Sequence, residues 1–186
     1  QFLDNGHWLL QTSFQNVIEV DIQGREVWRY EPSQAERVEI HSFRRLPSGL
    51  TMVAESGPGR ILEIDRDGRI QHTLPLTLEK RDPHRDTRLV RPTSDGGYVV
   101  AHEGDLKVRQ YDRTGHVLWT YDVQSQVYSA SQLANGNFLI GTGGGHSVLE
   151  VSREGKIVWQ VSQNDLPGVS LAWVTMTERL DNGNTW

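Results

Sequence analysis

The sequence predicts an all-β protein, a β-propeller of four-stranded antiparallel blades with about four blades present. A turn that begins with Asp or Ser and closes on Gly occurs four times, and its glycines are 44, 47 and 40 residues apart: Gly24, Gly68, Gly115 and Gly155. No stretch shows the sustained 3.6-residue apolar period of a helix. Repeats of this length with strand-like flanks are typical of propellers, whereas solenoids of similar repeat length are built from helices.

A second turn recurs in step with the first. Its glycines follow Asn, Ser or Asp between β-prone runs, as in tight hairpins: Gly6, Gly49, Gly96, Gly136 and Gly183. Each of the first four precedes the next turn glycine by 18 or 19 residues, while the connections to the following hairpin vary from 21 to 28. Constant hairpins with variable connections indicate one supersecondary unit repeated along the chain.

Each complete unit divides into four short strands. In the second unit we expect them at about 39–46, 50–55, 60–65 and 69–74. The third unit gives 88–93, 98–102, 107–112 and 116–123, and the fourth gives 127–133, 137–142, 147–152 and 156–161. The whole chain, 1–186, is then one propeller domain or propeller fragment, with units at about 1–37, 38–78, 79–126 and 127–169 and the start of another at 170–186.

A tryptophan stands four residues after three of the turn glycines, on the last strand of its unit: Trp28, Trp119 and Trp159. A blade must bury both faces against its neighbours, and a large flat indole fills that space well. We therefore interpret these tryptophans as structural docking residues. His72 takes the equivalent place in the second unit and is interpreted as a packing substitute.

This Asp-x-x-Gly-x-x-x-Trp pattern resembles the tryptophan-docking repeat of quinoprotein-type, PQQ-like β-propellers, over essentially the whole chain. Residues 180–185, Leu-Asp-Asn-Gly-Asn-Thr, are also similar to repeats of the six-bladed aryl-sulfate sulfotransferases. The resemblance implies the fold and not one activity. Quinoprotein dehydrogenases are generally eight-bladed, and about four units cannot enclose a PQQ ring in that way, so no cofactor is expected.

Two arrangements of the chain ends fit the pattern. In a closed ring, residues 174–179 would add an inner strand to the sheet formed by the first unit. Against this, residues 180–186 repeat what residues 3–8 already provide. We therefore expect a fragment of a six- to eight-bladed ring, whose open edges could promote self-association.

Composition excludes several function classes. The net charge is −5, so no basic surface favours nucleic acid, and no apolar run is long enough for a transmembrane segment. The absence of cysteine excludes disulfides, thiolate metal sites and thiol catalysis. Together with the quinoprotein-like resemblance, it favours an extracytoplasmic location, periplasmic or secreted.

The first strand of each propeller blade lines the central channel, and candidate binding residues lie there. Alignment on the hairpin glycine minus eight places four different residues at one position: His41, Arg88, Tyr128 and Thr175. Variation within a repeating scaffold is what a ligand site at the channel mouth would show. Simple filling of the channel would show it too.

The insertion at 79–91 is the second candidate. It carries Arg81, His84 and Arg85 near Arg88, and a cationic patch there would suit a carboxylate or sulfate group. The alternative is a solvated loop with internal ion pairs. No regular His or Asp spacing predicts a metal site, and the acidic turn at Asp65 is interpreted as a hairpin turn.

Two functions remain open. The first is a non-catalytic platform that binds a small anionic ligand or a protein partner through the channel mouth. The alternative is an enzyme of the aryl-sulfotransferase-like kind, with His41 as nucleophile and arginines around the sulfuryl group. Self-paired side chains at the mouth would favour the platform, and a convergent, perturbed histidine would favour the enzyme.

Overall fold

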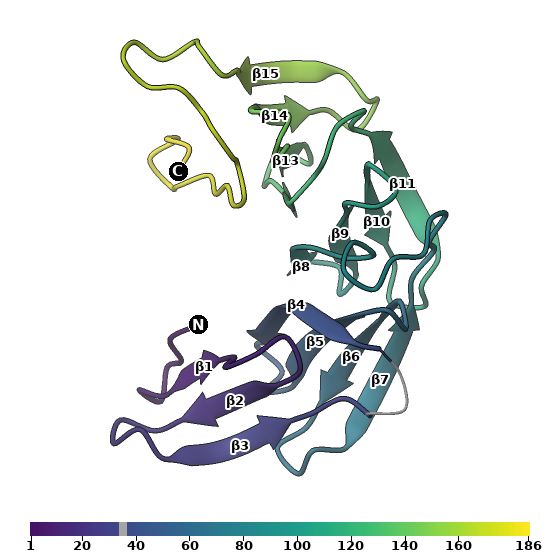
Figure 1. Cartoon of the computed structure of the whole chain (residues 1–186), viewed down its shortest axis with the longest axis vertical. Helices are drawn as coiled ribbons and strands as arrows, with labels where there is room; N and C mark the ends of the chain where they lie inside the picture. Colours follow the sequence, from purple (N-terminus) through teal and green to yellow (C-terminus); the bar gives the residue numbers. More distant parts are fainter. Residues whose placement is uncertain (34–36) are drawn as a thin grey trace.

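The computed structural model describes residues 1–33 and 37–186, which form four antiparallel β-sheets side by side in an arc (Figure 1). The described residues contain no helix, and none that could span a membrane. In Figure 1 the outer strands β3, β7, β11 and β15 follow the convex side, while β4 and β8 face the hollow. The predicted all-β propeller of four-stranded blades is therefore confirmed.

Each sheet is built from strands that are consecutive in the chain. The first has three strands, β1 (Trp8–Leu10), β2 (Val17–Val20) and β3 (Glu26–Tyr30). The second has β4 (Glu39–Arg45), β5 (Thr51–Ser56), β6 (Arg60–Ile64) and β7 (Ile70–Pro75). The third has β8 (Val90–Pro92), β9 (Tyr98–His102), β10 (Lys107–Tyr111) and β11 (Val117–Asp122). The fourth has β12 (Ser129–Gln132), β13 (Phe138–Gly141), β14 (Val148–Val151) and β15 (Ile157–Val161).

The turn that ends on the repeated glycine is organised by its first side chain. Oδ1 of Asp112 accepts hydrogen bonds from the backbone N–H groups of Thr114 (2.8 Å) and His116 (3.0 Å). Gly115 adopts a φ of +91°, which a side chain would disfavour. Hydrogen bonding, first of all from the Thr114 side chain, lowers the pKa of Asp112 to about 2. The carboxylate thus stabilises the hairpin through bonds within its own turn.

The core lies between the sheets. The middle strands are buried on both faces, and every residue of β5 and β9 is buried. Alternate residues of β5 serve different interfaces: Val53 packs toward the first sheet, whereas Met52 and Ala54 pack toward the third. This explains why these strands are apolar runs without the alternation of a half-exposed sheet.

The outer strand of each blade contacts the turn of the next one. The indole N–H of Trp28 donates to the carbonyl of Asp65 (3.1 Å), and that of Trp119 donates to the carbonyl of Arg153 (2.8 Å). Nε2 of His72 lies 2.8 Å from the carbonyl of Arg113. The histidine therefore makes the same kind of bond as the tryptophans that it replaces.

An arginine of each of these turns also binds a side chain of the preceding blade. The cross-strand partner of Trp28 is the fully buried Glu19, which binds Arg66 of the next blade. The other two interfaces repeat this: Glu63, opposite His72, accepts from Arg113 at 2.9 Å, and Gln110, opposite Trp119, accepts from Arg153 at 2.9 Å. We call this two-way arrangement the docking contact. It recurs at all three interfaces between the four sheets.

The C-terminal segment packs on the fourth sheet. Val174 pairs with Gly143, and Arg179 binds Glu150 at 2.9 Å and lies over the ring of Trp159 at 5.3 Å. Within the described residues, none of 174–179 pairs with β1, whose free side is bordered by Gln1 and Phe2. The pairing required by the ring-closure alternative is therefore not formed in this structure.

The insertion between β7 and β8 is an ordered loop held by buried polar groups. The carboxylate of Asp86 accepts the backbone N–H groups of Asp82 (2.7 Å) and Gly57 (3.0 Å). The fully buried His102 lies with Nδ1 2.7 Å from the Asp86 carbonyl and with Nε2 2.8 Å from the Tyr111 hydroxyl. Both bonds suit a neutral imidazole that donates from Nδ1 and accepts at Nε2.

Replacing Trp28 by Ala should lower the free energy of unfolding by about 3–5 kcal/mol, because it removes a buried indole and its bond to Asp65. Trp159→Ala is the matched control. Trp159 is 37% exposed and has no following four-stranded sheet, so its loss should cost no more than about 2 kcal/mol. Urea denaturation of both variants measures the difference, and equal losses would contradict the docking role.

Burial lowers the pKa of His102 to about 4. A histidine that takes up a proton more readily when unfolded contributes stability at neutral pH and loses it as the pH falls. The free energy of unfolding should therefore decline between about pH 6.5 and about pH 4, by up to about 3 kcal/mol from this group. His102→Gln, which cannot be protonated there, should show a shallower decline in denaturation at a series of pH values. An unchanged slope would rule out His102 as the source.

Candidate functional site

The inner strand of each blade is irregular at the predicted channel position. A β-bulge in β4 makes His41 the extra residue of that strand. The backbone N–H of Arg88 donates to the carbonyl of Ala101, beyond the paired part of β8, and that of Tyr128 donates to the carbonyl of Gly141 next to β12. Bulges redirect side chains away from the regular alternation of a strand.

The residues at this position in three successive blades contact one another in a row: His41, Arg88 and Tyr128. Nδ1 of His41 lies 3.4 Å from Nη1 of Arg88, whose guanidinium lies 4.9 Å from the centre of the Tyr128 ring. The alignment of the repeats thus brought together residues that are 47 and 40 positions apart. Thr175, the fourth residue at this position, has no hydrogen bond to the other three in the described part of the chain.

His84 of the insertion joins this row. Its Nδ1 lies 2.6 Å from Oε2 of Glu39, and its ring centre is 5.3 Å from that of His41. Phe14 lies against both imidazoles, with ring centres 5.0 Å from His41 and 6.4 Å from His84. We call this set the mouth cluster; it comprises His41, His84, Arg88, Tyr128, Glu39 and Glu103.

The expected cationic patch is neutralised. Arg88 binds Glu103, with Nε 2.5 Å from Oε2, and Nε of Arg85 lies 3.7 Å from Oε1 of the same carboxylate. Nε of Arg81 lies 3.9 Å from Asp86. Glu103 is buried and follows β9, so folding brings it under the insertion. The sequence alone did not predict this pairing, because 103 lies outside the insertion.

His41 is the perturbed group of the mouth cluster. Burial, followed by the charge of Arg88, lowers its pKa to about 4, so its imidazole is neutral at pH 7. Nε2 of His41 is buried and has no hydrogen-bond partner among the described residues. Its neighbour is Oε2 of Glu39, at 3.4 Å. Glu39, His41 and His84 offer ligand atoms within 4.8 Å of one another, a possible metal site that the sequence did not predict.

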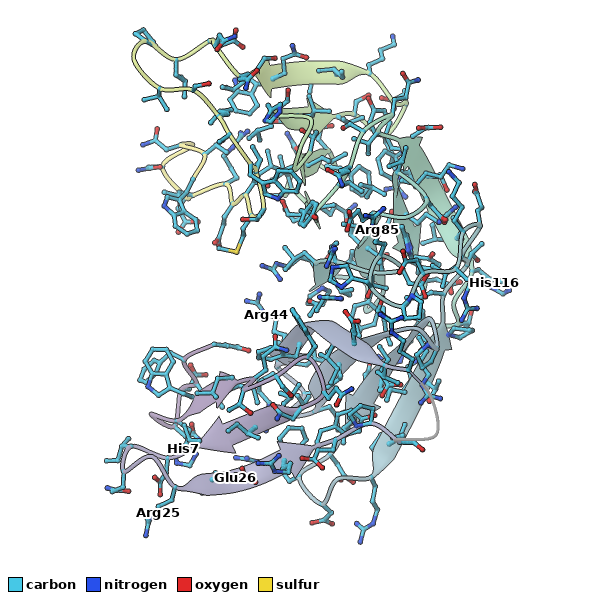
Figure 2. All side chains as sticks on the ribbon, in the orientation of Figure 1. His7, Arg25, Glu26, Arg44, Arg85 and His116 are labelled. Atoms are coloured by element: carbon cyan, nitrogen blue, oxygen red, sulfur yellow. The ribbon has the colours of Figure 1, made fainter. Side chains whose placement is uncertain are left out.

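A second ring of equivalent residues lies three positions further along the same strands, at the hairpin glycine minus five. Its members, Arg44, Arg91, Ser131 and Glu178, line one cavity of about 680 Å³. Figure 2 shows Arg44 projecting from β4 into the hollow of the arc. Sequence analysis missed this ring, although the alignment that selected His41 and Arg88 would have found it.

The two arginines of this ring share the cavity with one carboxylate of the ring, Glu178. Neither Arg44 nor Arg91 lies within ion-pair distance of a carboxylate in residues 1–33 and 37–186. The side-chain contacts of Arg91 are its own strand's Val90 carbonyl (3.4 Å) and the sulfur of Met176 (3.9 Å). Burial, followed by the charge of the nearby Arg44, lowers the pKa of Arg91, and the charge of Glu178 opposes this shift. Paired guanidinium groups in a concave site are suited to binding carboxylate, sulfate or phosphate groups.

Comparison with solved structures finds proteins of the propeller fold. A protein of unknown function from Bacteroides caccae matches with a TM-score of 0.83 and 27% identity over 96% of this chain and 65% of that one. Virginiamycin B lyase from Staphylococcus aureus, solved as an inactive variant with quinupristin, matches with a TM-score of 0.69 and 11% identity over 100% of this chain and 67% of that one. This chain thus spans less than two thirds of the Bacteroides structure. Because the identity to the lyase is only 11%, this similarity shows a shared fold and nothing about activity.

No curated protein matches the chain. These comparisons do not show the similarity to aryl-sulfate sulfotransferases, which stays a prediction. A family model described as outer membrane protein assembly factor BamB matches residues 82–179, which is 98 of the 186 residues. The predicted resemblance to PQQ-like repeats is confirmed, and the chain belongs to this family of PQQ-like β-propellers.

Proposed function

We propose that the chain is a non-catalytic binding platform that receives an anionic group in the hollow of its arc. One observation carries this proposal: Arg44 and Arg91 line a common cavity, and neither forms an ion pair among the described residues, although Glu178 and Asp181 line the same cavity. The protein has a net charge of −5, and most of its other arginines are paired. Two like charges held together in a protein of this composition favour binding of a negative group.

The mouth cluster supports a platform in a different way. Arg88 is bound to Glu103 and His84 to Glu39, so a ligand at the mouth would have to displace existing ion pairs. Arg44 and Arg91 have no such bonds to break. We therefore propose that the inner ring binds the anionic group. The residues at the mouth, among them Arg81, Arg85 and Tyr128, would form the rim around this binding site.

The ligand class follows from this chemistry. A carboxylate- or sulfate-bearing group fits two guanidinium forks, and it can belong to a small molecule or to an acidic segment of a partner protein. The family is described as an outer membrane protein assembly factor, which supports a protein partner and an extracytoplasmic location for this chain. Ser131 and Gln132 add neutral polar groups to the cavity wall.

The double variant Arg44→Gln/Arg91→Gln should weaken binding of an anionic probe at least about tenfold, because it removes two charged donors. Isothermal titration with sulfate, succinate and an oligoglutamate peptide measures this, and the peptide distinguishes a protein partner from a small ligand. Since neither arginine supports an ion pair within the described chain, the fold should persist.

Arg69→Gln is the control for this experiment. Arg69 pairs with Asp67 on the outer rim, and both side chains are largely exposed. Its replacement changes the net charge in the same direction and should leave binding unchanged. Equal weakening by Arg69→Gln would show a general charge effect, and no binding of any probe by the wild type would rule out the platform.

A propeller enzyme is the second candidate, and His41 favours it. Its imidazole is neutral at pH 7, Nε2 is unpartnered among the described residues, and Arg88 lies beside it. Solved propellers of similar fold include a lyase, so catalysis is compatible with this architecture. A neutral imidazole near an arginine is what a transferase of sulfuryl groups would need.

Assay of aryl sulfate turnover by the wild type and His41→Ala tests this alternative. If His41 is the nucleophile, the wild type turns over the substrate and the variant loses the activity by several orders of magnitude. Activity that is unchanged in His41→Ala would remove His41 as nucleophile. Absence of activity in the wild type would exclude this substrate class.

A further inference from the structure

We propose that Glu39, His41 and His84 form a binding site for a divalent transition-metal ion of the zinc class. The site joins strand β4 of the second sheet to the insertion that precedes the third. It goes beyond the anion-binding function, which uses the inner ring.

The three side chains already converge. Oε2 of Glu39 lies 2.6 Å from Nδ1 of His84 and 3.4 Å from Nε2 of His41, and all ligand atoms lie within 4.8 Å of one another. In a tetrahedral site, two metal–ligand bonds of about 2.1 Å hold their ligand atoms about 3.4 Å apart. A small rotation of His84, which is 46% exposed, therefore suffices to close the set around an ion.

The unpartnered nitrogen of His41 is an independent observation. The His41 side chain is only 7% exposed, and its Nε2 is fully buried without a hydrogen bond to any described residue. A buried polar atom without a partner is costly, so it normally has a reason in the structure. The bulge in β4 turns this side chain toward Glu39 and His84, where a bound ion would satisfy Nε2.

The donor set selects the class of ion. Two imidazole nitrogens and one carboxylate oxygen suit Zn²⁺ and its neighbours in the transition series, whereas Ca²⁺ and Mg²⁺ prefer oxygen ligands throughout. Three protein ligands leave a fourth position for water or another ligand. The ring of Phe14 lies against both histidines and would shield one side of the ion.

The surrounding charges permit a cation. Among the described residues, two arginines border the set: Arg37 lies 3.4 Å from Oε1 of Glu39, and Arg88 lies beside His41 with its charge balanced by the buried Glu103. Coordination through Nε2 requires the proton of His41 on Nδ1, which gives up the 3.4 Å contact with Arg88. Arg88 keeps its bonds to Glu103 and its position over Tyr128, so only its weakest contact is lost.

Titration of the metal-free, untagged chain with Zn²⁺ tests the proposal. The wild type should bind one ion and melt at a higher temperature in its presence, because the ion bridges two parts of the folded chain. His84→Ala should reduce the affinity at least tenfold, and so should Glu39→Gln. His84 lies on the insertion with an exposed side chain, so its loss should leave the fold intact.

His116→Ala is the matched control. His116 is an exposed histidine 3.4 Å from Asp112, and Figure 2 shows it on the convex side of the arc. Its removal should not change the affinity. Titration with Co²⁺ adds a spectroscopic readout, because low-coordinate Co²⁺ with nitrogen ligands absorbs in the visible range. This absorption should appear in the wild type and His116→Ala and be lost in His84→Ala.

Three results would overturn the site. The first is absence of saturable Zn²⁺ binding by the wild type. The second is binding that His84→Ala and Glu39→Gln leave unchanged, which would place the ion elsewhere, for instance at surface histidines. Tighter binding of Ca²⁺ than of Zn²⁺ would contradict the proposed ligand set.

Discussion

The docking contact between neighbouring blades is the constraint on which the rest of the structure depends. An aromatic or imidazole N–H of the outer strand reaches the turn of the next blade, and an arginine of that turn returns to Glu19, Glu63 or Gln110. The second and third sheets bury apolar residues on both faces, so their stability depends on how their neighbours are placed. His72 shows that the directed bond, rather than the indole itself, is the feature common to all three interfaces.

Because the outer and middle strands maintain the scaffold, the inner strands can vary. Two rings of equivalent positions result, one at the mouth and one in the hollow. Carboxylates from β4 and from the segment after β9 balance the charges at the mouth, whereas Arg44 and Arg91 in the hollow keep theirs. In the proposed platform, the neutralised rim and the charged interior would attract an anion to the hollow.

The two proposed sites would bind ions of opposite charge. The inner ring offers two guanidinium donors, and the set of Glu39, His41 and His84 offers metal ligands next to an arginine that is already paired. His41 of the metal site and Arg44 of the inner ring lie three positions apart on β4, so a bound metal ion would stabilise the strand that carries Arg44. Binding at one site can therefore be measured in variants of the other.

The sequence by itself determined the repeat, the four-stranded units and the position of nearly every strand, because turns and strand patterns are local properties. Every expected strand of the last three units is found within two residues of its place, and β9 is found at 98–102 as expected. Alignment of the repeats also brought His41, Arg88 and Tyr128 together. The tertiary structure alone decided which charges are balanced. Glu103 and Glu39 reach the insertion from other segments, while no carboxylate of the described chain comes within ion-pair distance of Arg44 or Arg91. Ion pairs form between side chains that folding brings together from distant segments. The repeat period of the sequence does not specify which of these side chains come into contact.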